Sequence, residues 1–208
     1  MKTGKLNGGF WFLPLFFLMV FSGKLWGIEL NELMGKQVFD KVKTSLKIQR
    51  DGKEIRPTLT WKFLKTRPFD EGRKNILEFK LFDGNVDVGV MQAENARVIL
   101  KSKKMELSLP GVELVLLANN KKENYKCVGS ALLKVFKEVF MEQKKTYGLS
   151  QKPVAKMYVY AAIDGALVYP KFGFISYKPD RNYDTFFNMV HDGKEFSKYD
   201  EQLKKCGM

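Results

Sequence analysis

The sequence predicts a single α/β domain with a central mixed, mostly antiparallel sheet flanked by helices, preceded by an N-terminal hydrophobic segment. Two apolar runs, at residues 112–118 and 154–161, are typical of strands buried inside a sheet. Between them, residues 128–144 place apolar side chains at helical spacing. The 208 residues suffice for one full core, and 45% hydrophobic with 28% charged residues is ordinary for a globular chain.

Residues 1–27 stand apart from this domain. Two lysines precede an apolar run at residues 10–21, and small residues follow it, as in a secretory signal peptide. The run is shorter than the roughly 20 residues of a spanning helix and contains Pro14. Because no small-x-small cleavage site follows, three alternatives stay open. They are a cleaved signal peptide, a signal anchor that reaches the membrane through residues 10–22, and a buried N-terminal helix.

Periodicity predicts the elements of the first half of the domain, which we take as residues 28–208. In chain order they are a helix at 28–40 and strands at 42–49, 57–64, 76–82, 86–91, 96–101 and 104–109. Asp51-Gly52 and Asp83-Gly84-Asn85 are turn signals, and the second indicates a hairpin. Residues 67–73 contain Pro and Gly and are expected to form a loop.

The second half begins after Pro110-Gly111 with the apolar run 112–118, which only Glu113 interrupts. This composition predicts a strand buried on both faces in the middle of the sheet. The elements expected after it are a loop at 119–126, a helix at 128–144, strands at 154–161 and 173–177, a short helix at 163–168 between them, and an outer tail from 179. The strand at 173–177 is expected to be the last.

The charge is strongly positive, with 36 Lys and Arg against 23 Asp and Glu and a net of +13. Such a surplus attracts anionic partners, including nucleic acid, lipid headgroups and the phosphates of a cofactor. The basic residues are scattered singly, which disfavours nucleic acid as the partner. Residues 1–27 contribute three lysines and no acid, so the basicity belongs to the domain.

The numbers of cysteines and histidines limit which kinds of site the chain can form. With two cysteines, Cys127 and Cys206, we expect no disulfide framework. Without Cys/His spacing and with His191 as the one histidine, we expect no metal site. His191 is expected on the surface of the tail, and Cys127 lacks a histidine nearby in sequence to serve it as a base.

Residues 112–174 carry the strongest functional signal. A buried strand, a polar loop and a small-residue helix start at Val128-Gly129-Ser130-Ala131 are a common device for holding a phosphate-bearing cofactor. The helix start offers backbone N–H groups and the positive end of the helix dipole. The segment ends on Tyr169-Pro-Lys-Phe-Gly-Phe174. This order resembles the acyl-CoA-binding half of the GCN5-related N-acetyltransferases, here about residues 110–177.

In that family the cofactor loop reads Arg or Gln, two residues, Gly, one residue, then Gly or Ala. The resemblance places this pattern on residues 124–129, where Gly129 matches while Asn124 and Cys127 depart from it. Lys126 is a candidate to restore some of the positive charge. The resemblance implies acetyl-CoA as co-substrate, with no metal, bound by Leu117, Ala118, Asn124, Lys126, Cys127, Val128, Gly129 and Ser130.

The resemblance also implies a cleft where two central strands splay apart and direct attack of an amine on the thioester. The exit segment matches the family's Tyr-x-Lys-x-Gly-Phe, which makes Tyr169 the candidate general acid. Pro170 stands where a helix-forming residue is common. Glu113, the one acid in the central run, is the candidate general base.

Three functions follow as alternatives. The first is an N-acetyltransferase that acts on a small-molecule or protein amine of unknown identity. The second is a non-catalytic protein of this fold that binds CoA or a partner, and the third is an exported basic protein that binds an anionic surface. Since acetyl-CoA is cytosolic, export requires an anchored domain that faces the cytosol, delivery into another cytosol, or loss of activity.

Overall fold

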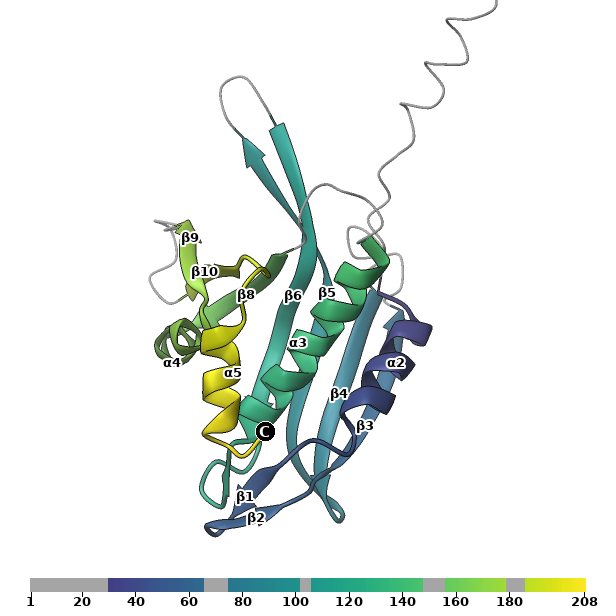
Figure 1. Ribbon diagram of the computed structural model, residues 1–208, viewed down its shortest axis with the longest axis vertical. Coiled ribbons are helices and arrows are strands. Elements are labelled where there is room, and N and C mark those ends of the chain that lie inside the picture. The colour runs from purple at the N-terminus through teal and green to yellow at the C-terminus, as the bar shows by residue number, and fades with distance from the viewer. Residues whose placement is uncertain (1–29, 66–74, 102–105, 148–155, 179–185) are drawn as a thin grey trace, which may run out of the picture.

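The computed structural model describes residues 30–65, 75–101, 106–147, 156–178 and 186–208 (Figure 1). The segment 1–27 and the loop expected at 67–73 lie outside the described residues. In the part that is described, no helix is long and apolar enough to cross a membrane.

A seven-stranded mixed sheet forms the centre of the domain, in the order β3-β4-β5-β6-β8-β10-β9. All neighbouring strands are antiparallel except β6 and β8, which are parallel. The strands are β3 (Thr58–Lys65), β4 (Asn75–Asp83), β5 (Val86–Lys101), β6 (Glu106–Asn119), β8 (Lys156–Ala162), β9 (Ile175–Lys178) and β10 (Phe186–His191). The predicted fold class, a mixed, mostly antiparallel sheet flanked by helices, is confirmed.

Three helices lie against one face of this sheet: α2 (Glu32–Val42), α3 (Val128–Tyr147) and α5 (Ser197–Lys204). Figure 1 shows α3 in the middle, and it contacts both α2 and α5. The short helix α4 (Ile163–Val168) follows β8, and the 3-10 helix η1 (Tyr169–Phe172) continues from it. The helix predicted at 163–168 is therefore confirmed to the residue.

The helices form where their apolar faces meet the sheet. Asn31 caps α2, since its side chain accepts a hydrogen bond from the backbone N–H of Met34 at 2.9 Å. Gly35 lets α2 approach β3, because a Cβ there would lie 2.6 Å from the Trp61 ring. On α3, buried residues recur at helical spacing and form the centre of the core: Val128, Ala131, Leu132, Val135, Phe136, Val139 and Phe140.

A second, three-stranded sheet lies at one end of the domain, in the order β2-β1-β7. Its strands are β1 (Ile48–Arg50), β2 (Lys53–Ile55) and β7 (Tyr125–Lys126). The turn predicted at Asp51-Gly52 joins β1 to β2, and both residues have positive φ. The strand expected at 42–49 is thus mostly wrong, because α2 runs to Val42 and the strand begins only at Ile48.

The hairpin at Asp83-Gly84-Asn85 is confirmed, but its second strand is longer than predicted. β5 runs without interruption to Lys101, and β6 runs from Glu106 through Pro110-Gly111 to Asn119. Pro110-Gly111 therefore does not separate two strands. The ladder between β5 and β6 continues on both sides of these residues.

Two further predictions are corrected. The strand after Gly173 is not the last, because β10 follows it in the chain and inserts between β8 and β9. The run 112–118 is central, as predicted, but it is not buried on both faces. The side chains of Val115 and Leu116 are 49% and 39% exposed.

Candidate cofactor site

The parallel strands β6 and β8 pair over only a short stretch and then part. Their ladder joins Gly111–Leu114 to Lys156–Val159 and ends there. Beyond that point β6 pairs only with β5, up to Asn119, and β8 pairs only with β10, up to Ala162. The two strands diverge toward their carboxyl ends, as Figure 1 shows. The splayed central strands that the resemblance implied are therefore present.

A β-bulge marks the place where the strands part. Gln92 lies opposite Leu116 and Ala93 lies opposite Leu114, so Val115 is the extra residue of β6. The bulge turns this part of β6 away from the regular ladder. It leaves two adjacent apolar side chains, Val115 and Leu116, partly exposed just beyond the last pair with β8.

Helix α3 begins at this same end of the strands. Val128 is fully buried against Gly89 of β5. A Cβ on Gly89 would lie 2.5 Å from the Val128 side chain and 2.9 Å from the carbonyl oxygen of Ala118, so Gly89 lets the start of α3 pack closely on the sheet. The first helical hydrogen bond runs from the N–H of Ala131 to the carbonyl of Cys127. The N–H groups of Val128, Gly129 and Ser130 thus precede the helical ladder, which makes this turn suited to an anion.

Gly129 in that turn faces open space. A Cβ built on Gly129 would meet no atom within 4 Å. The residue therefore faces free space at the positive end of the α3 dipole. This is the property that the family pattern requires of its final Gly.

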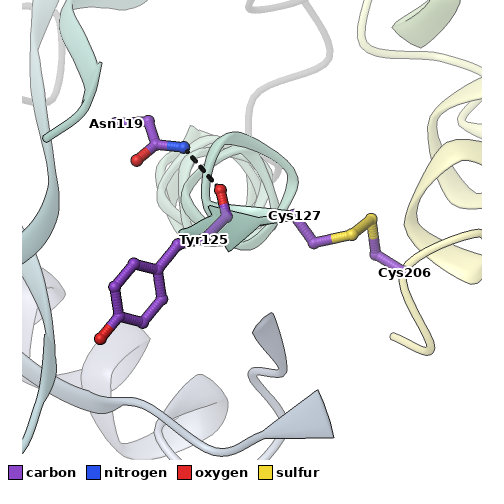
Figure 2. Close-up of a disulfide and its surroundings, with 4 residues drawn as sticks. All are labelled: Asn119, Tyr125, Cys127 and Cys206. Atoms are coloured by element: carbon purple, nitrogen blue, oxygen red, sulfur yellow. Dashed lines mark hydrogen bonds between the residues drawn. A yellow bond between two sulfur atoms is a disulfide. The ribbon is translucent and has the colours of Figure 1, made fainter. Parts of the chain in front are cut away.

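The loop that precedes α3 is held in place from both sides. The side chain of Asn119 donates to the carbonyl of Tyr125 at 3.2 Å and accepts from the N–H of Lys121 at 3.0 Å. The Tyr125 hydroxyl donates to Asp83 at 2.8 Å. Figure 2 shows the Asn119 contact, with the Tyr125 ring on the opposite side of β7 from Cys127. The contact between Tyr125 and Asp83 joins residues 42 positions apart, which no local pattern in the sequence indicates.

Within the loop, the residues predicted to bind a cofactor have different surroundings. Asn124 and Lys126 are exposed, and Lys126 pairs through its backbone with β1. The carbonyl of Asn124 accepts from the N–H of Asp51 at 3.1 Å. Leu117 and Ala118 are half-buried on β6 near the start of α3. The structure thus gathers these residues at one end of the sheet.

Cys127 and Cys206 form a disulfide, which corrects the expectation that the two cysteines are not bridged. The bond links the residue before α3 to the segment that follows α5, 79 positions along the chain (Figure 2). Sequence spacing gave no signal for this pairing. Only the packing of α5 against α3 brings the two cysteines together.

Tyr169, the candidate general acid, lies in η1 beside the carboxyl end of β8. Its side chain is buried, and its ring contacts Phe174 in an edge-on arrangement at 5.6 Å. Burial raises the pKa of Tyr169 to about 12, so the phenol keeps its proton at neutral pH. Gly173 closes η1 with φ 89, a left-handed conformation that explains the Gly of the exit segment.

Glu113, the candidate base, lies on the other face of the sheet. Its neighbours Val112 and Leu114 are buried in the core beneath α3, so the alternation of strand side chains turns Glu113 away from that core. Glu94 of β5 lies directly opposite Glu113 in the ladder and is 7% exposed. No pattern in the sequence indicated Glu94, because its position opposite Glu113 depends on the register between β5 and β6.

His191 is buried, which corrects its expected place on the surface of the tail. It ends β10, and its ring stacks on Phe196 at 4.8 Å. Its Nδ1 accepts a hydrogen bond from the N–H of Gly193 at 3.0 Å. The histidine is thus part of the aromatic core under α5. Among the described residues no group of three His, Cys, Asp or Glu could hold a metal ion.

Comparisons with known proteins give distant structural likenesses. No family model matches the chain, and no curated protein is significantly similar to it in sequence. A mutant of the toxin AtaT bound to the C-terminus of the antitoxin AtaR and acetyl-CoA is 13% identical, with 57% of this chain and 68% of that one covered at a TM-score of 0.42. The same mutant with AtaR but described without acetyl-CoA is 14% identical, with 57% and 67% covered at 0.42.

The PaiA N-acetyltransferase of Thermoplasma acidophilum, in complex with coenzyme A, is 19% identical to this chain. The match covers 56% of this chain and 60% of that one, at a TM-score of 0.37. These similarities concern the arrangement of little more than half of the chain.

Proposed function

We propose that this protein binds acetyl-CoA where β6 and β8 part and transfers the acetyl group to an amine. The observation that carries this proposal is the start of α3 at the carboxyl end of two parallel strands that diverge after Leu114. A pyrophosphate at the first turn of α3 would meet the N–H groups of residues 128–130 and the open space at Gly129. The partly exposed Val115 and Leu116 offer apolar surface to a flexible acyl-carrying arm.

The chemistry assigned to the chain's own residues is proton transfer. As the amine attacks the thioester carbonyl, a C–N bond forms and the C–S bond breaks. The amine gives up a proton to a base, for which Glu113 is the candidate, and the thiolate takes one from an acid. Tyr169 is the candidate for the second role because its hydroxyl is protonated at neutral pH, although burial raises its pKa to about 12 and so makes it a weaker proton donor than an exposed tyrosine. Glu113 and Tyr169 lie on opposite faces of the sheet, which would place amine and cofactor on opposite sides of the parted strands.

The test is acetyl-CoA binding by calorimetry on the full chain, measured with and without a thiol reductant, followed by thiol release with a panel of amines. A Gly129→Asp variant should weaken binding by at least about tenfold, because a carboxylate would repel the phosphates. It should leave the fold intact, since an acid in the first turn of a helix is favourable. Gly129→Ala is the matched control, as it adds no charge and meets no neighbour.

Catalysis is tested separately from binding. Tyr169→Phe should abolish most thiol release and leave acetyl-CoA affinity unchanged, since it removes only the hydroxyl. Equal turnover in Tyr169→Phe would exclude Tyr169 as the acid. The absence of acetyl-CoA binding in every redox state would refute the proposed function. It would leave the third alternative, an anionic surface, to be tested with vesicles that contain an acidic phospholipid.

A specific observation favours a second candidate, a non-catalytic protein of this fold. Cys127 stands where the family pattern has Gly, and its side chain is bonded to Cys206. Tyr169 is covered by its aromatic neighbours. This candidate would be favoured over the enzyme if the protein binds acetyl-CoA but releases no CoA thiol with any amine of the panel, in either redox state.

A further inference from the structure

The backbone at Cys127 has the conformation of a glycine. Its φ is 64, in the left-handed region that is sterically unfavourable for a residue with a side chain. Cys127 occupies the position of the first Gly in the cofactor-loop pattern. The loop therefore has at this position a backbone that glycine adopts readily, and it carries a side chain where close approach of a phosphate favours none.

That side chain is tied to the end of the chain. After α5, the N–H groups of Cys206, Gly207 and Met208 donate to carbonyls of the last helical turn, at Leu203 or Lys204. The chain thus folds back at Cys206 and meets Cys127. A Cβ on Gly207 would lie 3.0 Å from a carboxylate oxygen of Glu54 in β2. The last residues are therefore held between the start of α3 and the small sheet.

Helix α5 itself lies between the two parts of the proposed site. On one side it contacts α3, where Lys137 forms an ion pair with Asp200 at 2.5 Å. On the other side it contacts η1, where the Tyr199 ring meets Phe172 at 5.0 Å. Figure 1 shows α5 in front of the region into which β6 and β8 diverge. The C-terminal segment thus lies next to the start of α3 through Cys206 and next to η1 through Tyr199.

We propose that the Cys127–Cys206 disulfide is a redox latch that holds this C-terminal segment beside the first turn of α3 and, in the oxidised protein, hinders a ligand as large as acetyl-CoA from reaching the open space at Gly129. The inference rests on the proposed function, because it assigns the latch to the acetyl-CoA site. Reduction frees Cys127 and residues 205–208 from each other. The first turn of α3 is then accessible, while Tyr199 keeps the folded domain together.

The redox step needs a dithiol as reductant. A thiolate of the dithiol attacks one sulfur of the bridge, the Sγ–Sγ bond breaks, and the second thiol displaces the protein thiol. Two electrons pass to the bridge, each cysteine leaves as a thiol, and the reductant becomes a disulfide. Disulfides persist in oxidising compartments and are reduced in the cytosol, where acetyl-CoA is found. The latch would therefore keep the site closed outside the cytosol and open it inside.

The experiment measures acetyl-CoA affinity by calorimetry on the full chain in oxidised form and after reduction with dithiothreitol. The reduced protein should bind at least about tenfold more tightly than the oxidised protein. Cys206→Ser should match the reduced protein in either buffer, because it cannot form the bridge. Cys127→Gly should bind at least as tightly in either buffer, because it removes the side chain as well as the bridge. Cys206→Ser with and without reductant is the control for direct effects of dithiothreitol.

Hydrogen exchange gives a readout that needs no cofactor. The amides of residues 128–130 and 205–208 should exchange faster in the reduced than in the oxidised protein, while those in the middle of α3 stay protected. Unchanged exchange at residues 128–130 would overturn the latch whatever the cofactor does. The reduced wild-type chain carries no substitution, so this comparison holds even where a variant fails to fold.

The other outcomes of these measurements distinguish failure of the proposed latch from failure of the proposed acetyl-CoA binding. Equal acetyl-CoA affinity in the oxidised and reduced proteins would overturn the latch and leave the proposed function standing. No binding in either form or in any variant would overturn both. Unfolding on reduction, seen by circular dichroism, would make the disulfide purely structural and would also overturn the latch.

Discussion

The hydroxyl of Tyr199 in α5 donates a hydrogen bond of 2.6 Å to the backbone carbonyl of Leu133 in α3. Tyr199 is fully buried, and among the described residues it is the largest side chain to be so. Burial, followed by nearby charged or titratable groups, raises the pKa of Tyr199 well above 10. The eight-residue helix α5 is thus joined to the core through Tyr199 and through Leu203, its other buried side chain.

Substitution of Tyr199 tests how firmly α5 is held. Tyr199→Phe should lower the free energy of unfolding by about 1 kcal/mol, because it removes one buried hydrogen bond. Tyr199→Ala should lower it by about 3–5 kcal/mol, because it also leaves a cavity. Urea unfolding of the two variants measures both values. Equal stability of Tyr199→Ala and wild type would mean that α5 is not docked as described.

Gly111 tests the joint between β6 and β8. A Cβ at Gly111 would lie 2.1 Å from the backbone carbonyl of Lys156, in the paired stretch just before the strands part. Gly111→Ala should therefore destabilise the protein by about 1–3 kcal/mol, measured by thermal or urea unfolding. Gly129→Ala, where the new Cβ meets nothing, should not destabilise it. A neutral Gly111→Ala would contradict the close pairing of the two strands.

His191 should titrate below its ordinary pKa of 6.5. Burial lowers the pKa of His191, the Asp192 carboxylate partly opposes this, and Lys137 and Lys156 lower it further. Protonation would also cost the hydrogen bond that Nδ1 accepts from Gly193. Since the chain has a single histidine, its imidazole signals in NMR report this pKa directly. A pKa at or above 6.5 would contradict the buried position.

The sign of the stability effect follows from this lowered pKa. The contribution of neutral His191 is fully present above pH 6.5, where both folded and unfolded chains are unprotonated. It is lost as the pH falls through the folded pKa, because the unfolded chain takes up the proton first. His191→Phe should remove this part of the pH dependence below pH 6.5. The comparison is made by urea unfolding from pH 7.5 downward.

The disulfide should stabilise the oxidised fold. It closes a loop with a sequence separation of 79, so Cys206→Ser should lower the free energy of unfolding by about 2–4 kcal/mol in oxidising buffer. In reducing buffer the variant and the wild type should be equally stable. Equal stability in oxidising buffer would indicate that the bridge is absent.

Cys127→Gly isolates the backbone strain at the same site. It should be more stable than Cys127→Ser by about 1 kcal/mol, because Gly adopts the left-handed φ of 64 without a steric penalty. Both variants lack the bridge, so their difference reports the conformation alone. Greater stability of Cys127→Ser would contradict the left-handed backbone.

Much of the fold is predictable from local sequence patterns. The helical spacing of residues 128–144, the hairpin at Asp83-Gly84-Asn85 and the short helix at 163–168 all correspond to elements of the structure. Each of these signals is contained in a few neighbouring residues. The predictions are wrong where contacts with a distant strand outweigh the local signal. Pro110-Gly111 was predicted to separate two strands, but it lies within β6 because β5 continues to pair with β6 there.

The candidate site was only partly predictable. The start of α3 and the position of Tyr169 follow from the strand-loop-helix order. The bulge at Val115 and the position of Glu94 opposite Glu113 depend on the register between two strands. The burial of His191 depends on β10 inserting between β8 and β9, which no pattern near residue 191 indicates.

The sequence by itself determined the class of the domain, the order of most elements and the place of the small-residue helix start. Periodicity and turn residues decide these because they act over one or two turns of chain. Only the tertiary structure decided that Cys127 meets Cys206, that α5 lies between α3 and η1, and that β6 and β8 part after Leu114. These features arise from contacts between segments that are distant in the chain. The packing that stabilises them cannot be inferred from the residues next to each position in the sequence.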